Sequence, residues 1–346
     1  MRPSTSRCMV GSSGYPMAPP HDKYKTNKST YQKAHRTDTI NQRKPHLSSM
    51  DSPFTLRTDL YPPISPDKLT GSLKGKNALI TGSGRGIGRE VALALAAAGA
   101  KIAITARTAS EVEATRAEVQ ELISGAGKVI GITADLLKRE DQERLVQEFH
   151  DQLGPIHLLI LNAGNNIFQP FHLTEADGWW DVMELNVRAP VELTRLFLPE
   201  MMRQNEGTII YTSSRAAKAD LPWTSSYNCA KTAITRFAGT LHAELEQLQP
   251  KEHNTANKIE VFSIHPGEIE TQLHQTAFPQ KTRNEAPYVV ELLERLGRTR
   301  PHFAPQLPAW TTVWLCAGKG AGLKGQFIDC TRDVEEQQDA FVESKK

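Results

Sequence analysis

Short runs of apolar residues alternate along the chain with longer segments in which apolar positions recur at helical spacing, beginning near Lys76. The short runs predict buried strands, and the longer segments predict amphipathic helices. Because the two kinds of element alternate, the pattern predicts βαβ units and an α/β fold with a doubly wound, mostly parallel sheet flanked by helices. The seven predicted strands are residues 78–80, 101–105, 129–133, 157–161, 208–212, 259–264 and 326–328.

The segments between these strands have the length and periodicity of helices. One helix is predicted from the turn after the first strand to Ala98, and others near residues 110–124 and 140–152. A longer helix covers most of residues 175–204, with Pro190 and Pro199 as kinks or local breaks. Residues 268–308 lack strong strand signals and are expected to form a fairly apolar substrate loop, containing Phe278, Pro279, Tyr288, Leu292, Leu293 and Phe303.

One domain, residues 74–332, accounts for this pattern, and the remaining segments differ from it in composition. Residues 1–52 are rich in Ser, Thr, Pro and basic residues, with Asp22 and Asp38 the only acids before residue 51. They predict a disordered basic tail, because they bury too little apolar surface to offset the entropy of ordering. Residues 53–73 predict an extended arm packed on the domain, and residues 333–346 predict a polar C-terminal tail.

The basic tail lacks the apolar segment of a secretory signal, so a cytoplasmic location is expected. Its few acids and many hydroxyl groups are also features of a mitochondrial transit peptide, although Pro16, Pro19 and Pro20 interrupt a long amphipathic helix. Mitochondrial import therefore stays open as an alternative.

Composition argues against several classes of protein. The net charge is +2 for 346 residues, which disfavours a dedicated nucleic-acid binder. No stretch approaches the roughly 20 apolar residues of a membrane span, so none is expected. The four cysteines are scattered without a CxxC pair, and neither a metal site nor a disulfide framework is expected.

A glycine-rich turn follows the first predicted strand and begins the first predicted helix. Its sequence is Thr81-Gly82-Ser83-Gly84-Arg85-Gly86-Ile87-Gly88. Glycines in such a turn let the backbone approach a pyrophosphate, and the unpaired N–H groups at the start of the helix attract the anion. Its position between a strand and a helix predicts a dinucleotide-binding site rather than a flexible loop.

The end of the second predicted strand indicates which dinucleotide binds. An Asp or Glu there would hold the ribose hydroxyls of NAD, whereas a nearby Arg accommodates the 2′-phosphate of NADP. Ala106 occupies the position expected for the acid, Arg107 follows it, and Arg85 offers a second guanidinium. The sequence therefore favours NADP(H), with NAD(H) as the alternative.

Tyr227 and Lys231 lie four residues apart on a predicted helix, so they share one face of it. A nearby ammonium favours the phenolate and lowers the pKa of a tyrosine, which is ordinarily near 10. With a cofactor cation acting in the same direction, this pair predicts a tyrosine that works as a general acid and base near neutral pH.

These motifs and their order make residues from about 73 to 328 resemble the short-chain dehydrogenase/reductase family, in its single-domain branch with a Rossmann-type fold. Residues 81–88 match the TGxxxGxG pattern of that family, and residues 227–231 match its YxxxK pattern. The resemblance implies that Asp135 hydrogen-bonds the adenine and that Asn162-Ala163-Gly164, the end of the NNAG motif, lies at the cofactor. Leu161 replaces the first Asn of that motif, which removes one hydrogen-bond donor.

The resemblance also implies a catalytic set. Ser214 would hold the substrate oxygen, Tyr227 would transfer the proton, and Lys231 would lower the tyrosine pKa and bind the nicotinamide ribose. Asn186 would support a water that links Lys231 to solvent. The residues expected at the nicotinamide carboxamide are Pro266, Gly267, Ile269 and Thr271.

Together these features predict an NADP(H)-dependent oxidoreductase that transfers hydride between nicotinamide and a carbonyl or secondary alcohol of a medium-sized, lipophilic or aromatic substrate. The resemblance implies a homo-dimer or homo-tetramer formed through the helices that carry Asn186 and Tyr227. A cofactor-binding sensor or scaffold without turnover is the alternative, and the intact Ser-Tyr-Lys pattern counts against it. Binding of nucleic acid or an anionic surface by residues 1–44 is disfavoured by the near-neutral charge and the lack of regularly spaced aromatic residues.

Overall fold

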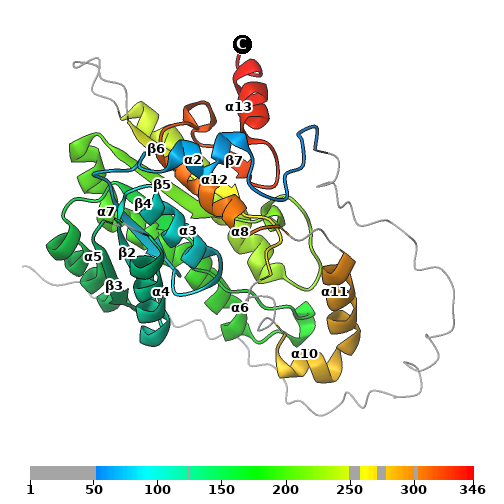
Figure 1. The fold of residues 1–346 in the computed structure, drawn as a ribbon. Coiled ribbons are helices and arrows are strands. Elements are labelled where there is room, and N and C mark those ends of the chain that lie inside the picture. Colours follow the sequence, from blue (N-terminus) through cyan, green and yellow to red (C-terminus); the bar gives the residue numbers. More distant parts are fainter. Residues whose placement is uncertain (1–51, 124, 126, 249–257, 271–277, 300–302) are drawn as a thin grey trace, which may run out of the picture. The chain divides into compact units, whose positions relative to one another are not determined.

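A seven-stranded sheet forms the centre of the domain (Figure 1). The computed structural model describes residues 52–346 except 124, 126, 249–257, 271–277 and 300–302. The strand order is β3-β2-β1-β4-β5-β6-β7, and every pairing is parallel. The strands are β1 (Asn77–Thr81), β2 (Lys101–Ala106), β3 (Val129–Thr133), β4 (Leu158–Leu161), β5 (Gly207–Thr212), β6 (Ile259–His265) and β7 (Phe327–Asp329). The predicted doubly wound α/β fold and all seven predicted strands are confirmed.

The chain changes direction across the sheet at β1, which pairs with β2 on one side and β4 on the other. Successive strands are added outward from β1 in one direction and then outward from β4 in the other. The connections that follow β1 and β4 therefore leave in opposite directions, and the crevice between them is where open α/β sheets bind their ligands. The fold places a candidate site at that edge.

Helices cover both faces of the sheet in two apolar layers. The first layer contains α3 (Gly86–Ala97), α4 (Ala109–Leu122) and α12 (Gln306–Cys316). The second contains α5 (Arg139–Leu153), α7 (Ala189–Gln204) and α8 (Ser225–Gln247). Buried strand residues alternate between the layers, with Ile80 in the first and Leu79 in the second, as period-2 side-chain geometry requires.

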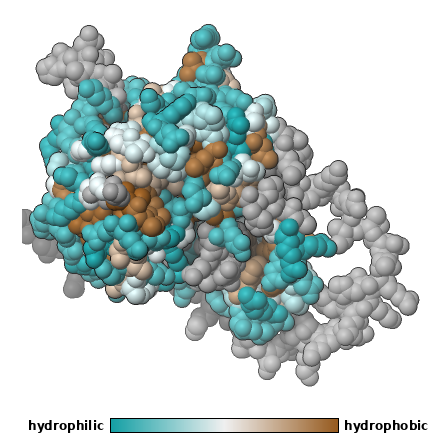
Figure 2. Space-filling model, in the orientation of Figure 1, coloured by the Kyte–Doolittle hydropathy of each residue, from teal (hydrophilic) through white to brown (hydrophobic). Residues whose placement is uncertain are grey.

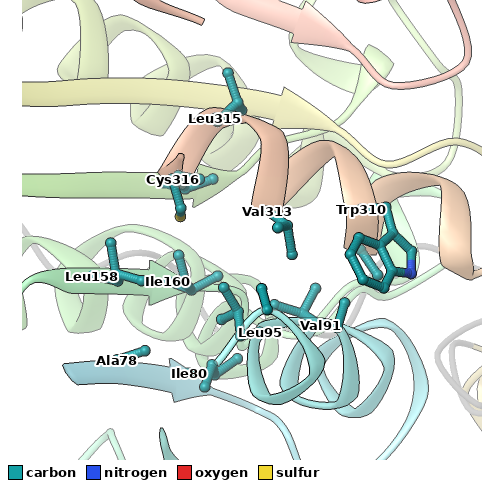
Figure 3. Packing of buried hydrophobic residues seen from close by; sticks show 14 of the residues in the cluster. Ala78, Ile80, Val91, Leu95, Leu158, Ile160, Trp310, Val313, Leu315 and Cys316 are labelled. Carbon is teal, nitrogen blue, oxygen red and sulfur yellow. The ribbon is translucent and has the colours of Figure 1, made fainter. Parts of the chain in front are cut away.

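Helix α12 is the main element that the pattern of apolar residues did not predict. From Leu307 to Cys316 each of its residues is buried, and it packs along α3 and against β5, in one apolar cluster with Leu158 and Ile160 of β4 (Figure 3). Trp310 and Val313 lie toward Val91 and Leu95 in this view. Because the helix is apolar all round, it has no polar face to mark its period, and such a segment reads as a buried helix only from its packing.

The long helix predicted over residues 175–204 is present in three parts. Helix α6 (Ala176–Met183) leads into one turn of π-helix, η4 (Glu184–Arg188), and then into α7. Pro190 lies near the start of α7, where a missing N–H costs little, and Pro199 lies inside it. The irregularity therefore falls just before Pro190, at the turn that carries Asn186.

Two further helices occupy the expected substrate loop. Helices α10 (Gln280–Glu285) and α11 (Pro287–Thr299) lie at one end of the domain beside α6 (Figure 1). Lys281 Nζ contacts Glu175 Oε1, next to α6, at 2.7 Å. The sequence showed no strong strand signal in residues 268–308, and the described residues of this stretch contain no strand.

The C-terminal segment is not the polar tail that its composition suggested. Residues 334–343 form helix α13 (Val334–Glu343), capped by the Asp333 carboxylate, which accepts hydrogen bonds from the Glu335 and Glu336 backbone N–H groups. Val334 and Gln337 are buried. The many charged residues of this segment made it resemble a solvent-exposed tail. The helix is held by only a few buried side chains, which its composition does not reveal.

The N-terminal arm packs on this C-terminal segment and is only partly extended, because it includes η2 (Pro62–Ile64) and α2 (Pro66–Leu69). Arg57 pairs with Asp333 at 2.7 Å, and the Tyr61 hydroxyl accepts a hydrogen bond from the Val334 N–H at 2.9 Å. Tyr61 and Ile64 are buried. Of the predicted disordered tail, residues 1–52, all but Ser52 lie outside the described residues.

Shortening the chain should separate the arm from the segment before it. A chain that begins at Ser52 should keep its stability, whereas one that begins at Pro66 should lose about 3–6 kcal/mol, since it gives up two buried side chains and the bond to Val334. Urea unfolding of both chains measures the difference. Equal stability would show that the arm contributes nothing to the folded state.

Polar residues predominate on the surface in view, and hydrophobic residues gather in separate patches (Figure 2). Among the described residues, no helix combines the length and apolar character needed to cross a membrane. The apolar side chains are concentrated in the two layers against the sheet.

Candidate active site

The glycine-rich turn joins β1 to α3 at the switch point of the sheet. Gly82 and Gly86 have φ angles of +64° and +55°, which favour glycine. A Cβ atom on Gly88 would lie 2.3 Å from the Gly82 carbonyl oxygen and 2.5 Å from Asn162 Nδ2. No other residue fits there, so the start of α3 is packed directly against the turn.

Hydrogen bonds fix this turn to the end of β4. Thr81 Oγ1 accepts hydrogen bonds from the backbone N–H groups of Asn162 and Ala163 at 2.9 and 3.0 Å. Asn162 Nδ2 donates to the Thr81 backbone carbonyl at 3.0 Å. The Ser83 hydroxyl is fully buried and donates to the Ile80 carbonyl at 2.7 Å. The side chain of Ser83 therefore shapes the turn, and Thr81, which the sequence analysis did not list as a site residue, connects its two halves.

The end of β2 lies beside the same turn. Ala106 is half-buried. Arg107 is exposed and makes no hydrogen bond or ion pair with another described residue. Arg85 Nη1 contacts Glu111 Oε1 at 2.9 Å. Glu111 was not anticipated. It lies in the first turn of α4, and a Cβ on Gly84 would be 2.8 Å from Glu111 Cβ.

Asp135 follows β3 at the next position along this edge. Its carboxylate accepts a hydrogen bond from the Leu137 N–H at 3.2 Å, and its own N–H donates to Asp141 at 2.8 Å. These bonds hold the loop after β3 in a defined shape at the same end of the sheet as the glycine-rich turn. The candidate adenine contact therefore lies on a fixed loop.

Ser214 and Tyr227 meet at the ends of β5 and the start of α8. Ser214 caps the 3₁₀ turn η5 (Arg215–Ala217), where its Oγ accepts from the Ala216 N–H at 3.1 Å. Removal of the Tyr227 hydroxyl from solvent raises its pKa to about 12, and a hydrogen bond with Ser214 opposes that rise. Desolvation therefore acts against the predicted lowering of this pKa by Lys231 and a cofactor cation together, which stays a prediction.

Lys231 is buried one turn further along α8. Its Nζ donates to the Thr212 carbonyl at 2.7 Å and lies 5.3 Å from the centroid of the Tyr227 ring. Burial lowers the pKa of this ammonium to about 7. The lysine thus lies beside the ring of Tyr227, while its hydrogen bond goes to Thr212.

Asn186 lies within reach of this group, on the π-helical turn η4. Its Nδ2 donates to the Asn165 and Val182 carbonyls at 3.0 and 2.9 Å. Its Oδ1 is buried without a partner among the described residues. A Cβ on Gly164 would lie 2.6 Å from this Oδ1 and 3.5 Å from Lys231 Nζ, so the glycine keeps the space between them open. Such π-turns occur often at functional sites.

The segment after β6 completes the edge. Pro266 and Ile269 are buried, and Gly267 has a φ of +97°. A Cβ on Gly267 would lie 2.8 Å from the Thr331 methyl group and 3.2 Å from the Phe303 ring. The tight turn is therefore packed on both sides. Thr271, the remaining predicted contact of this segment, lies outside the described residues.

Aromatic residues from three segments form two ring pairs, and one of them contains Trp223, which lies just before the start of the Tyr227 helix. The Phe168 and Phe278 rings are 5.3 Å apart, and the Trp223 and Tyr288 rings 6.2 Å. Trp223, four residues before Tyr227, has a φ of +64°, which is costly for a bulky side chain. Its carbonyl accepts from the Gln169 N–H at 2.7 Å, which helps hold this conformation.

The comparisons with known proteins agree with this geometry. Residues 76–282 match the family model for short chain dehydrogenases. The chain is 32% identical to a short chain dehydrogenase of Pseudocercospora fijiensis, over 82% of this chain and 89% of the relative. It is 30% identical to human dehydrogenase/reductase SDR family member 4, over 74% of this chain and 86% of that one.

A solved structure shows the same fold. The crystal structure of a short-chain type dehydrogenase/reductase from Mycobacterium marinum superposes with a TM-score of 0.62 at 26% identity, covering 77% of this chain and 97% of that one. The chain belongs to the short-chain dehydrogenase/reductase family, and it is an oxidoreductase that uses an NAD(P)-type cofactor on CH–OH and carbonyl groups.

Proposed function

We propose that this protein is an NADP(H)-dependent oxidoreductase that interconverts a carbonyl and a secondary alcohol on a medium-sized, lipophilic aromatic substrate. The observation that carries the proposal is the contact between Ser214 and the Tyr227 hydroxyl, with Lys231 buried beside the Tyr227 ring. Asn186, Ser214, Tyr227 and Lys231 form the proposed catalytic set.

The residues at the edge of the sheet fit a dinucleotide. Neither Gly88 nor Gly82 has room for a side chain, so the backbone of the turn can come close to a pyrophosphate. The N–H groups at the start of α3 would then attract the anion. When bound, the nicotinamide supplies or accepts the hydride. The residues proposed to hold the cofactor are Gly82, Ser83, Arg85, Gly86, Ile87, Gly88, Arg107, Asp135, Asn162, Ala163, Gly164, Tyr227, Lys231, Pro266, Gly267, Ile269 and Thr271.

Ser214 and Tyr227 act on the substrate oxygen. In carbonyl reduction both donate hydrogen bonds to the oxygen as negative charge develops on it, and Tyr227 then transfers its proton to it. A phenol with a pKa of about 12 is protonated at neutral pH, which is the form that reduction requires. In this proposal Lys231 and Asn186, whose Oδ1 has no hydrogen-bond partner among the described residues, serve the return of a proton from solvent to the tyrosine.

The aromatic pairs support the substrate class. Phe168 and Trp223 come from the loops that precede α6 and α8, and Phe278 and Tyr288 come from the segment of α10 and α11. Aromatic rings favour offset or edge contacts with other rings. A planar aromatic substrate would therefore bind more tightly beside these four side chains than an aliphatic one. The exposed Leu196 and Met202 on α7 support self-association through the α7 and α8 layer.

Oxidation of NADPH, followed by absorbance against a panel of ketones, tests the proposal. Acetophenone, benzil and menadione represent aromatic carbonyl compounds, and cyclohexanone and acetone represent aliphatic ones. We expect turnover with at least one aromatic compound and much lower kcat/KM with the aliphatic ones. Tight NADPH binding without turnover of any compound would favour a non-catalytic sensor or scaffold instead.

The cofactor preference makes a separate prediction. Because β2 ends without a carboxylate, Arg107 is left to meet a 2′-phosphate, while Arg85 first has to leave Glu111. Hydrogen bonds to charged groups contribute about 1.5–3 kcal/mol, or roughly ten- to a hundredfold in affinity. Ala106→Asp together with Arg107→Leu should therefore shift the Kd ratio toward NAD(H). Titration of both cofactors into both proteins measures it, and an unchanged ratio would remove Arg107 from the site.

A further inference from the structure

An ion pair outside the proposed catalytic set connects two parts of the site. Arg215 directly follows Ser214, and Glu268 directly follows Gly267. The Arg215 guanidinium and the Glu268 carboxylate are in contact, with side chains that are 18% and 20% exposed. An ion pair shielded to this extent is held more firmly than one on the open surface.

The pair lies where the sheet no longer holds the two segments together. Strands β5 and β6 are paired as far as Thr212 and Ile264, and one further bond joins the Ser213 N–H to the Ile264 carbonyl at 2.7 Å. Beyond these residues the chain after β5 carries the proposed oxygen-binding Ser214, and the chain after β6 carries the proposed nicotinamide-binding turn. Arg215 and Glu268 bridge these two segments past the last sheet contact.

Both ends of the bridge are fixed to their surroundings. On the Ser214 side, the turn η5 packs against α8 and the Ala216 N–H donates to Ser214 Oγ. On the other side, the Glu268 carbonyl accepts from the Phe303 N–H at 3.4 Å, and the Ala304 N–H donates to Thr58 of the N-terminal arm at 3.0 Å. His265 lies near Arg215, and burial lowers the pKa of its imidazole, so it does not oppose the guanidinium.

We propose that Arg215 and Glu268 are positioning residues that fix the distance between the group binding the substrate oxygen and the turn binding the nicotinamide. The proposal rests on the proposed function of Ser214 and of residues 266–269. Hydride transfer requires near contact between the reacting carbons, and a misplacement of about 1 Å can lower the rate about a hundredfold. Breaking the pair should therefore affect kcat more than the binding of either ligand.

Charge reversal tests this in the full-length protein. Arg215→Glu and Glu268→Arg should each lower kcat about ten- to a hundredfold, with smaller changes in substrate KM and NADPH Kd. The double reversal should restore kcat at least about tenfold over either single variant, because the two charges are again opposite. Arg215→Met and Glu268→Gln remove each charge without reversing it. These variants replace the charge reversals if a reversed chain does not fold.

The chain offers a matched control. Lys324 and Glu260 form an ion pair at 3.2 Å with side chains 26% and 13% exposed, and Glu260 lies near the start of β6, away from the site. Lys324→Glu and Glu260→Lys should lower thermal stability comparably to the Arg215 and Glu268 variants but leave kcat unchanged. Equal loss of kcat in both pairs, or a double reversal no better than the poorer single variant, would overturn the proposal.

Hydrogen–deuterium exchange separates this proposal from the proposed function. In each single reversal, the amides of residues 214–218 and 266–270 should exchange faster, and the double reversal should restore their protection. If the wild type turns over no compound of the panel, the proposed function fails while this measurement still decides whether the pair holds the two segments. Unchanged exchange in both single variants would overturn the positioning role.

Discussion

Replacing Tyr227 by phenylalanine should lower kcat by about a hundred- to ten-thousandfold, the usual contribution of a positioned proton donor. The ring remains in place beside Lys231, so packing of the helix should change little. The hydroxyl that contacts Ser214 is lost, and with it the only proposed proton donor to the substrate oxygen. Steady-state kinetics with NADPH and the best compound of the panel measures the effect, and NADPH titration by fluorescence gives the accompanying Kd.

The raised pKa of Tyr227 sharpens this prediction. Because the hydroxyl has a pKa of about 12, titration of Tyr227 should not change carbonyl reduction between about pH 6 and pH 9, so any change there reports Lys231, whose pKa is about 7. Alcohol oxidation needs the phenolate and should increase with pH. Ser214→Ala serves as the companion variant, since it keeps the donor but removes its partner. A Tyr227→Phe protein with near-normal kcat would remove Tyr227 from the catalytic set.

The sheet could be predicted from the sequence because parallel strands buried on both faces are continuous apolar runs. In β1 the residues from Asn77 to Thr81 are all buried, and in β5 only Thr212 is not fully buried. The amphipathic helix α5 was equally visible from its period. Every strand except β3 was misplaced by one residue at one or both ends, because a terminal residue depends on hydrogen bonds that the pattern of apolar positions does not record.

Elements without a regular polar face escaped prediction. Helix α12 is buried on all sides, and α13 is short and mostly polar, so neither shows the long regular alternation that marks a half-buried helix. The N-terminal arm owes its place to contacts with Asp333 and Val334, more than 270 positions away in the chain. Such long-range pairs cannot be read from local periodicity.

The parts of the candidate site that depend on backbone geometry could be predicted from the sequence. The hydrogen-bond partners of its side chains could not. Glycines at positions 82 and 88 had to be glycines for steric reasons, and the structure agrees. The spacing of Tyr227 and Lys231 placed both on one face of a helix, but not the bond from Lys231 to Thr212. Spacing also did not show the burial of the Tyr227 hydroxyl, which raises its pKa, so the predicted lowering by Lys231 and a cofactor cation together stays a prediction.

Lys231→Met should abolish turnover and at the same time change how stability depends on pH. In the folded protein the pKa of Lys231 falls from its usual 10.5 to about 7, because the ammonium is buried. Between these two values the unfolded chain binds more protons than the folded one, so stability increases with pH through this window. Below pH 7 the lysine is charged in both states, and the full cost of burying the ammonium opposes folding.

The methionine variant removes this cost and leaves the rest of the fold in place. From about pH 6 to pH 9, the wild type should gain roughly 2–3 kcal/mol from Lys231 that the variant does not gain. Loss of the bond to Thr212 costs the variant about 1 kcal/mol at every pH, so the variant should be the more stable protein at pH 6 and lose that advantage as pH increases.

Urea unfolding of both proteins across this pH range, with kcat measured on the same samples, decides the matter. Other groups titrate in the window, but they are shared by both proteins and cancel in the difference. Parallel stability curves would mean that Lys231 keeps an ordinary pKa in the folded state, and normal turnover in the variant would exclude it from the catalytic set. A variant that is more stable at pH 6 but inactive would show that burying this ammonium serves activity at a cost in stability, as expected of an active-site residue.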